Sequence, residues 1–264
     1  MGDYRQVAAL GSSFAAGPGL TPVANRAARR SARNYPSLVA RALGAGLTDL
    51  TVSGATTRTI LDSSQRTLGT RFPPQIDAVP ADADLITITA GGNDLDYIGA
   101  MMRLSVAGRL QRRRLLKPVG QFLAGRVRVD ADPAQTAAVT EGLTRVVTQA
   151  RAKASQARIV LVDYLTVLGD DAVPAPELPL SPAQIDCLRR VADVLAEATR
   201  AAADRTGADL VRASALSREH GLGSAEPWVS GFPGGLRSGT VPFHPNPAGM
   251  QAVADATVAV LSRR

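Results

Sequence analysis

The sequence predicts an α/β fold in which the strands form a parallel sheet. Short apolar or β-branched runs alternate with longer segments of helical periodicity, as in chains built from βα units. Each apolar run also leads into a turn-rich or helix-starting segment. The five expected strands cover residues 6–10, 49–53, 84–89, 158–162 and 208–211.

Three of the later helices have a readable start. In each, a side chain that can cap a helix stands directly before a proline, and proline is favoured at the first helical position. The pairs are Asp132-Pro133, Ser181-Pro182 and Asn246-Pro247. Gln184 completes a capping box with Ser181, which strengthens the second prediction.

Length and composition indicate one domain over residues 1–264. A chain of 264 residues can bury a substantial single core, and 45% of its residues are hydrophobic. No apolar run approaches the roughly 18 to 20 residues that a transmembrane helix needs. We therefore expect no membrane span, although peripheral contact with a membrane stays open.

The net charge of +7 comes almost entirely from arginine, since Lys117 and Lys153 are the only lysines. Charge bears on association and not on chemistry. With 4% aromatic residues and no zinc-ligand spacing, we do not expect a nucleic-acid partner. The start of the chain shows no export signal, and Cys187, the single cysteine, cannot form an internal disulfide. The expected location is the cytoplasm.

A basic amphipathic insertion is expected at about residues 97–130. Between Met101 and Val129, arginines are interleaved with apolar side chains. The simpler interpretation is a solvated helical segment whose apolar side packs on the core. The alternative is a lid or docking surface for an acyl chain or an anionic group, because the segment follows a polar motif at a strand end.

Polar motifs follow three of the strands. Ser13, in Gly11-Ser12-Ser13, lies on the turn after the first strand, where a hydroxyl is exposed near backbone N–H groups. Gly54 follows the second strand, and glycine lets its amide approach a bound group closely. Asn93, in Gly91-Gly92-Asn93-Asp94, offers a neutral donor suited to a developing alkoxide. Taken singly, these motifs also fit a helix cap, a tight turn and an Asx turn.

A serine nucleophile needs a base, and the chain has two histidines. His244 is held between prolines directly before the last expected helix, whereas His220 lies in a segment without such constraints. We therefore expect His244 to be the base and His220 to lie at the surface or the substrate rim.

Together the four segments resemble the SGNH hydrolases, also called GDSL esterases and lipases, in residue type and in order. The pieces Gly91-Gly92-Asn93-Asp94 and Phe243-His244-Pro245-Asn246 are the most specific. The segments Asn34-Tyr35-Pro36, Pro73-Pro74-Gln75 and Pro227-Trp228-Val229 resemble the actinobacterial branch. The resemblance implies a flavodoxin-like, three-layer α/β/α sandwich and hydrolysis of acyl or acetyl esters without a metal or other cofactor. It also implies that Ser13 is the nucleophile, and that the oxyanion hole consists of the Ser13 backbone amide, Gly54 and Asn93.

The sequence departs from the family pattern at two positions. Ser12 replaces the aspartate that usually precedes the nucleophile, which leaves the nucleophile itself in place. Val241 replaces the aspartate that usually lies three residues before the histidine and completes the triad. A Ser-His dyad is therefore expected, with a backbone carbonyl near Val241 accepting the Nδ1 proton.

The expected activity is hydrolysis of a small-molecule or lipid ester through an acyl-serine intermediate, with short-chain esters as the first choice. One alternative keeps the site but transfers the acyl group to an alcohol. Another is a non-catalytic module that binds lipid or a partner. A Ser-Lys mechanism is disfavoured, because both lysines lie outside the four motifs. No metal site is expected, since no His, Cys or carboxylate cluster has ligand spacing.

Overall fold

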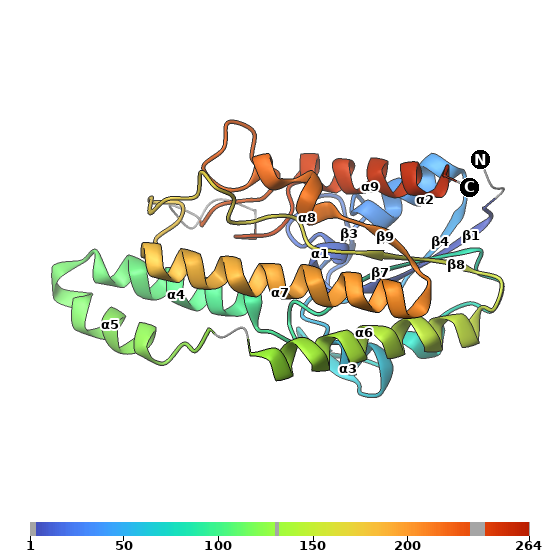
Figure 1. Cartoon of the computed structure of the whole chain (residues 1–264), viewed down its shortest axis with the longest axis horizontal. Coiled ribbons are helices and arrows are strands. Elements are labelled where there is room, and N and C mark those ends of the chain that lie inside the picture. Colours follow the sequence, from blue (N-terminus) through green and yellow to red (C-terminus); the bar gives the residue numbers. More distant parts are fainter. Residues whose placement is uncertain (1–3, 130–131, 233–240, 264) are drawn as a thin grey trace.

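Five parallel strands form the central sheet, in the order β4-β1-β7-β8-β9 (Figure 1). The computed structural model describes residues 4–129, 132–232 and 241–263. The strands of this sheet are β1 (Gln6–Gly11), β4 (Gly46–Asp49), β7 (Leu85–Thr89), β8 (Arg158–Val162) and β9 (Asp209–Val211). The order and the parallel pairing confirm the predicted α/β class and the flavodoxin-like arrangement.

Helices cover both faces of the sheet, which gives three layers. Helices α2 and α9 lie on one face, and α3, α6 and α7 lie on the other (Figure 1). The helix bounds are α1 (Ser13–Ala16), α2 (Tyr35–Leu43), α3 (Thr57–Leu61), α4 (Tyr97–Gln111), α5 (Lys117–Gly125), α6 (Pro133–Lys153), α7 (Pro182–Thr206), α8 (Ala213–Leu216) and α9 (Pro247–Leu261). Short 3₁₀ helices are η1 (Gln75–Ala78), η2 (Arg114–Leu116) and η3 (Arg218–His220). No helix in the described part of the chain is long and apolar enough to cross a membrane.

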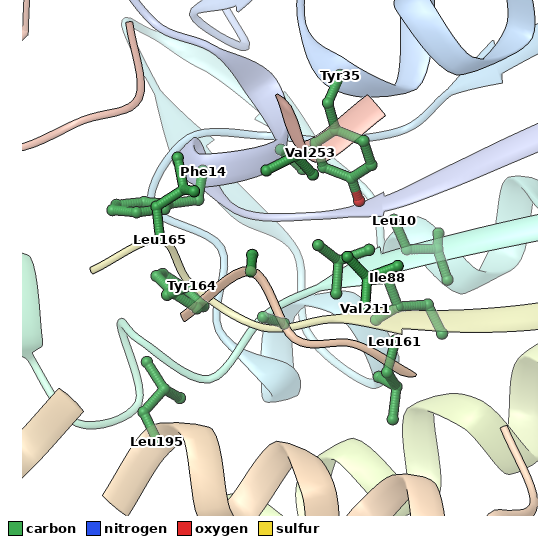
Figure 2. Close-up of a cluster of buried hydrophobic side chains, with 14 of the residues drawn as sticks. Leu10, Phe14, Tyr35, Ile88, Leu161, Tyr164, Leu165, Leu195, Val211 and Val253 are labelled. Atoms are coloured by element: carbon green, nitrogen blue, oxygen red, sulfur yellow. The ribbon is translucent and has the colours of Figure 1, made fainter. Parts of the chain in front are cut away.

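The core sits between the layers and includes apolar side chains from β1, β7, β8 and β9. Leu10, Ile88, Leu161 and Val211 meet in the sheet, with Tyr35 and Val253 on one side and Leu195 on the other (Figure 2). Strands β1 and β7 are buried on both faces, which explains their nearly continuous apolar sequence. Burying a side chain of this size contributes about 1.5–3 kcal/mol.

The three predicted helix starts are confirmed. Asp132, Ser181 and Asn246 are the N-caps of α6, α7 and α9, and each side chain accepts a hydrogen bond from a backbone N–H of the first turn. Gln184 closes the capping box of α7. These caps fix the residues at which α6, α7 and α9 begin.

The second predicted strand was placed too late in the chain. It was expected at residues 49–53, but β4 is Gly46–Asp49. The Asp49 carboxylate accepts hydrogen bonds from the Thr51 N–H and hydroxyl, a local turn that ends regular pairing. The following residues still run beside β1 through bonds from Leu50 N to Ala9 O and from Val52 N to Gly11 O. Gly54 therefore still follows this strand at the edge where Ser13 lies.

Two small antiparallel hairpins were not predicted. Strands β2 (Val23–Asn25) and β3 (Arg30–Ser31) form one, and β5 (Gln65–Thr67) and β6 (Thr70–Phe72) form the other. Their residues are mostly polar and exposed or half-buried, so no alternating apolar pattern announces them.

The predicted insertion comprises α4, η2 and α5, which project at the end of the molecule opposite the two termini (Figure 1). Its last residue, at position 130, lies outside the described residues. Met101 and Leu104 of α4 are buried, as the simpler interpretation expects. Leu115 and Phe122 instead face solvent, so only part of its apolar surface packs on the core.

Candidate active site

Ser13 stands at the carboxyl end of β1 as the first residue of α1. The turn before it needs a glycine, because a Cβ on Gly11 would lie 2.4 Å from the carbonyl oxygen of Thr89. The buried amide side chain of Gln75 bonds both the N–H and the carbonyl of Gly11, at 2.8 and 3.0 Å. This double contact holds the turn from which the Ser13 hydroxyl projects.

The imidazole of His244 meets that hydroxyl. Its Nε2 lies 2.8 Å from Ser13 Oγ, although the two residues are 231 positions apart in the chain. Phe243 has φ of 62°, which is uncommon for a bulky residue, and its fully buried ring keeps it there. Ser230 also fixes the segment by accepting from Phe243 N and donating to His244 O. The chain is thus constrained on both sides of the imidazole.

A backbone carbonyl takes the place of a carboxylate behind the ring. His244 Nδ1 lies 2.8 Å from the oxygen of Pro242. Because a carbonyl oxygen can only accept, Nδ1 carries the proton and Nε2 is left to accept from the serine. No carboxylate bonds this ring in the part of the chain that the structure describes. This carbonyl belongs to the residue after the half-buried Val241, in the region where the sequence led us to expect the acceptor for the Nδ1 proton.

Burial lowers the pKa of His244 to about 4, and the positive charge of Arg29 adds to the effect. The bond to Pro242 acts in the opposite direction but does not compensate. The imidazole is consequently neutral at pH 7, the state in which it can accept a proton. Ser13 and His244 each keep a small exposed fraction, 8% and 7%, so the pair is not sealed from solvent.

His220 lies elsewhere. Its Nδ1 bonds the carbonyl oxygen of Glu226, and its ring stacks on Trp228 with centroids 3.8 Å apart. Among the described residues its ring bonds Glu226 and stacks on Trp228, away from Ser13, which agrees with the preference for His244.

Within the described residues, two backbone N–H groups of the candidate site have no protein acceptor: that of Ser13 itself and that of Gly54, in the loop that follows the neighbouring strand. Among residues 4–129, 132–232 and 241–263, neither Ser13 N nor Gly54 N donates a hydrogen bond. Gly54 has φ of 87° and is exposed, so its amide is open to a small group. The preceding carbonyl, on Ser53, accepts from Gln65 Nε2 at 2.8 Å, which orients this peptide.

Asn93 is anchored by one of its two amide hydrogens. Asn93 Nδ2 donates to Ala55 O at 2.8 Å, which ties the third motif to the loop of Gly54. A primary amide has a second N–H, and no hydrogen bond within the described chain uses it. The anchored side chain thus keeps one donor.

Asp94 reinforces the same connection. Its carboxylate accepts from the Thr57 hydroxyl at 2.6 Å and from Thr57 N at 3.1 Å. Burial raises its pKa, while the bonds from Thr57 act against the rise. Asp94 therefore holds the loops of Gly54 and Asn93 together, and within the described residues its carboxylate does not bond His244.

Tyr164 is a further residue of the site that sequence patterns did not reveal. It follows β8, and its hydroxyl lies 2.8 Å from Ser12 Oγ and accepts from Gly92 N at 3.1 Å. Its ring packs against Phe14 (Figure 2). The Phe14 ring in turn lies 5.5 Å from the His244 ring, centroid to centroid. One buried side chain thereby contacts the neighbours of both Ser13 and Asn93.

The described residues contain no group of three His, Cys, Asp or Glu side chains that could hold a metal ion. A cavity of about 440 Å³ lies between α7 and the ends of β8 and β9, and its lining includes Tyr164 but neither Ser13 nor His244. The chemistry of the dyad is therefore separate from this cavity.

Comparison with known proteins finds relatives that are described as lipases or acylhydrolases. A model of the GDSL-like lipase/acylhydrolase family matches residues 9–252. Lipase 2 of Streptomyces coelicolor is 33% identical over 264 residues, covering 96% of this chain and 84% of that protein.

Two solved structures share the fold. One is phospholipase A1 from Streptomyces albidoflavus NA297, with a TM-score of 0.74 and 20% identity, covering 97% of this chain and 99% of that one. The other is an extracellular lipase from Streptomyces rimosus, with a TM-score of 0.71, 21% identity and the same coverage. At these identities the likeness is one of fold.

Proposed function

The chain belongs to the GDSL-like lipase/acylhydrolase family, the carboxylic-ester hydrolases of SGNH type, and on that premise we propose that Ser13 and His244 form its catalytic dyad. The observation that carries the proposal is the 2.8 Å contact between Ser13 Oγ and His244 Nε2. A serine hydroxyl is a weak nucleophile unless a base within hydrogen-bonding reach removes its proton. The neutral imidazole, with its proton on Nδ1, meets that need.

The reaction proceeds by acyl transfer in two stages. His244 Nε2 takes the Ser13 proton while Oγ attacks the ester carbonyl, and the imidazolium then gives that proton to the departing alkoxide. Water, deprotonated by the same nitrogen, then attacks the acyl-serine. Ser13 Oγ leaves, takes that proton back from the imidazolium, and the acid is released. The Pro242 carbonyl stabilises the Nδ1 proton in both stages without itself becoming charged.

Three donors stabilise the oxyanion in this proposal: the N–H groups of Ser13 and Gly54 and the second amide hydrogen of Asn93. Support comes from the lack of any protein acceptor for these hydrogens among the described residues. Donors that are fixed before the reaction act where charge develops and need no reorganisation. Asp94 and Tyr164 are positioning residues in this scheme.

The proposed substrates are carboxylic esters of small molecules or lipids, with short-chain esters as the first assay. The acyl-serine step is tested by partitioning. Phenyl acetate and p-nitrophenyl acetate are hydrolysed in the presence of methanol, and the ratio of methyl acetate to acetic acid is measured. A common acetyl-serine gives the same ratio for both leaving groups. A ratio that changes with the leaving group, or no turnover at all, contradicts the proposal.

A further inference from the structure

The basic insert, defined here as residues 97–129, has an unusual distribution of charge. It contains no aspartate or glutamate, and its positive charge exceeds the net +7 of the whole chain. The basic residues are Arg103, Arg109, Arg112, Arg113, Arg114, Lys117, Arg126 and Arg128.

Apolar side chains on the same segment point into solvent. Leu115, Val119 and Phe122 recur at helical spacing, and they are 92%, 49% and 61% exposed. Helix α5 packs on α4 through its other side, where a Cβ on Gly120 would lie 2.6 Å from Ala107 O. Gly120 permits this close approach, so the stripe of Leu115, Val119 and Phe122 faces away from the protein.

Most of the charges around this apolar stripe have no ionic partner among the described residues. Arg103 pairs with Asp96, at the start of α4. No ion pair within the described chain involves Arg112, Arg113, Arg114, Lys117, Arg126 or Arg128. The Arg126 guanidinium lies over the Phe122 ring, 5.0 Å from its centroid, so charge and apolar surface adjoin directly.

The insert lies at the end of the fold that carries the candidate dyad. The strands run from the end with the termini towards α4 and α5, and Ser13 follows the carboxyl end of β1 (Figure 1). Arg109 of α4 lies over the Phe232 ring, and Phe232 stacks on Phe243, the residue before His244. The insert is thus connected, through Phe232, to the segment that positions the imidazole.

We propose that the apolar stripe and its basic rim dock the protein onto a bilayer that contains anionic lipid. An interfacial helix of this kind inserts its apolar face at the level of the headgroups while cationic side chains bind anionic ones. A second copy of the chain would meet this face with like charge. A nucleic acid would use the basic residues but gains nothing from exposed Leu115, Val119 and Phe122. The proposal concerns binding and does not depend on the chemistry of Ser13.

The test is cosedimentation of the full chain with vesicles of phosphatidylcholine alone and of phosphatidylcholine mixed with phosphatidylglycerol. We expect binding to the mixed vesicles that falls with added salt, and little binding to phosphatidylcholine. The charge variant is R113Q/R114Q/K117Q, and the apolar variant is L115S/V119S/F122S. Each Lys or Arg near an anionic surface is worth about fivefold, so the charge variant should bind about a hundredfold more weakly.

Matched controls carry the same kinds of change elsewhere. R41Q/K153Q/R263Q removes three exposed charges at the other end of the molecule, and V23S/L68S/L216S removes three exposed apolar side chains that lie apart. Both controls, and Ser13→Ala, should bind as the parent does. All insert variants should keep the parent's turnover of a soluble short-chain ester, which shows that they fold.

Three results would overturn the proposal: no binding to mixed vesicles, equal binding to both kinds of vesicle, or parent-like binding by the apolar variant. Binding of duplex DNA by the parent and the apolar variant alike, without vesicle binding, would assign the charge to a polyanion instead. A parent protein that binds mixed vesicles but hydrolyses no ester, or a Ser13→Ala variant that keeps the parent's esterase activity, would count against the dyad and leave the docking surface standing.

Discussion

The hydroxyl of Tyr164 lies 2.8 Å from the hydroxyl of Ser12, the residue that stands where the family has an aspartate. The same hydroxyl accepts from Gly92 N. Both partners adjoin residues of the candidate site, Ser13 and Asn93. The loop of Ser12, which carries a carboxylate in the family pattern, is therefore connected to the loop of Gly92 by hydrogen bonds between uncharged groups, through the Tyr164 hydroxyl.

Replacing Tyr164 with Phe should destabilise the fold by about 1–3 kcal/mol, because the buried Ser12 hydroxyl and Gly92 N–H lose their partner. Tyr97→Phe is the matched control. Its hydroxyl is buried without a partner in the described structure, so its removal should be neutral or stabilising. Urea unfolding measures both. Equal effects of the two substitutions would show that the Tyr164 hydroxyl does not hold the loops.

Asn93→Ala should lower kcat by about a hundred- to a thousandfold, with a much smaller change in KM, because an oxyanion donor acts mainly in the transition state. Asn93→Asp keeps the shape but removes both donors and adds negative charge, so its kcat should fall at least as far. Steady-state kinetics on a soluble ester tests this. If both variants lose thermal stability but retain kcat, the bond from Asn93 to Ala55 is only structural.

Val241→Asp restores a carboxylate at the family's triad position. In a triad enzyme the orienting aspartate is worth roughly ten-thousandfold in kcat. Here we expect a change of less than about threefold, because His244 Nδ1 already donates to Pro242 O. A large gain in kcat would mean that the carbonyl orients the imidazole poorly and that the dyad works at a cost.

The acid limb of the pH dependence of kcat/KM should have its midpoint near pH 4. Burial lowers the pKa of His244 to about 4, and only the neutral imidazole accepts the serine proton, so activity persists well below pH 6.5. In the unfolded chain the same histidine has an ordinary pKa of about 6.5, so the unfolded state binds the proton at a higher pH than the folded state does. His244 therefore lowers the free energy of unfolding as the pH falls from about 6.5 towards 4. His220→Gln should leave the profile unchanged. An acid limb centred near 6.5 would contradict this account.

Apolar pattern and capping residues were enough to predict the sheet and three helix starts. Strand β8 has the expected bounds, whereas β4 was misplaced because the Asp49 turn interrupts an apolar run. The contact of Ser13 with His244 could be anticipated because only two histidines compete. The missing family aspartate also led us to expect a backbone carbonyl near Val241 behind the imidazole, but the sequence could not single out Pro242. The Tyr164 bridge could not be anticipated, since a tyrosine after a strand has many uses. The cytoplasmic location stays a prediction.

The most direct test of the Ser13–His244 dyad is mass spectrometry after treatment with a fluorophosphonate, which reacts with activated serines. The parent, Ser13→Ala and His244→Ala are compared, with Ser53→Ala as a control on another buried serine. We expect one adduct, on the peptide that contains Ser13, absent from Ser13→Ala, strongly reduced in His244→Ala and retained in the control. An unlabelled parent, or an adduct on another serine that survives both substitutions, would contradict the account.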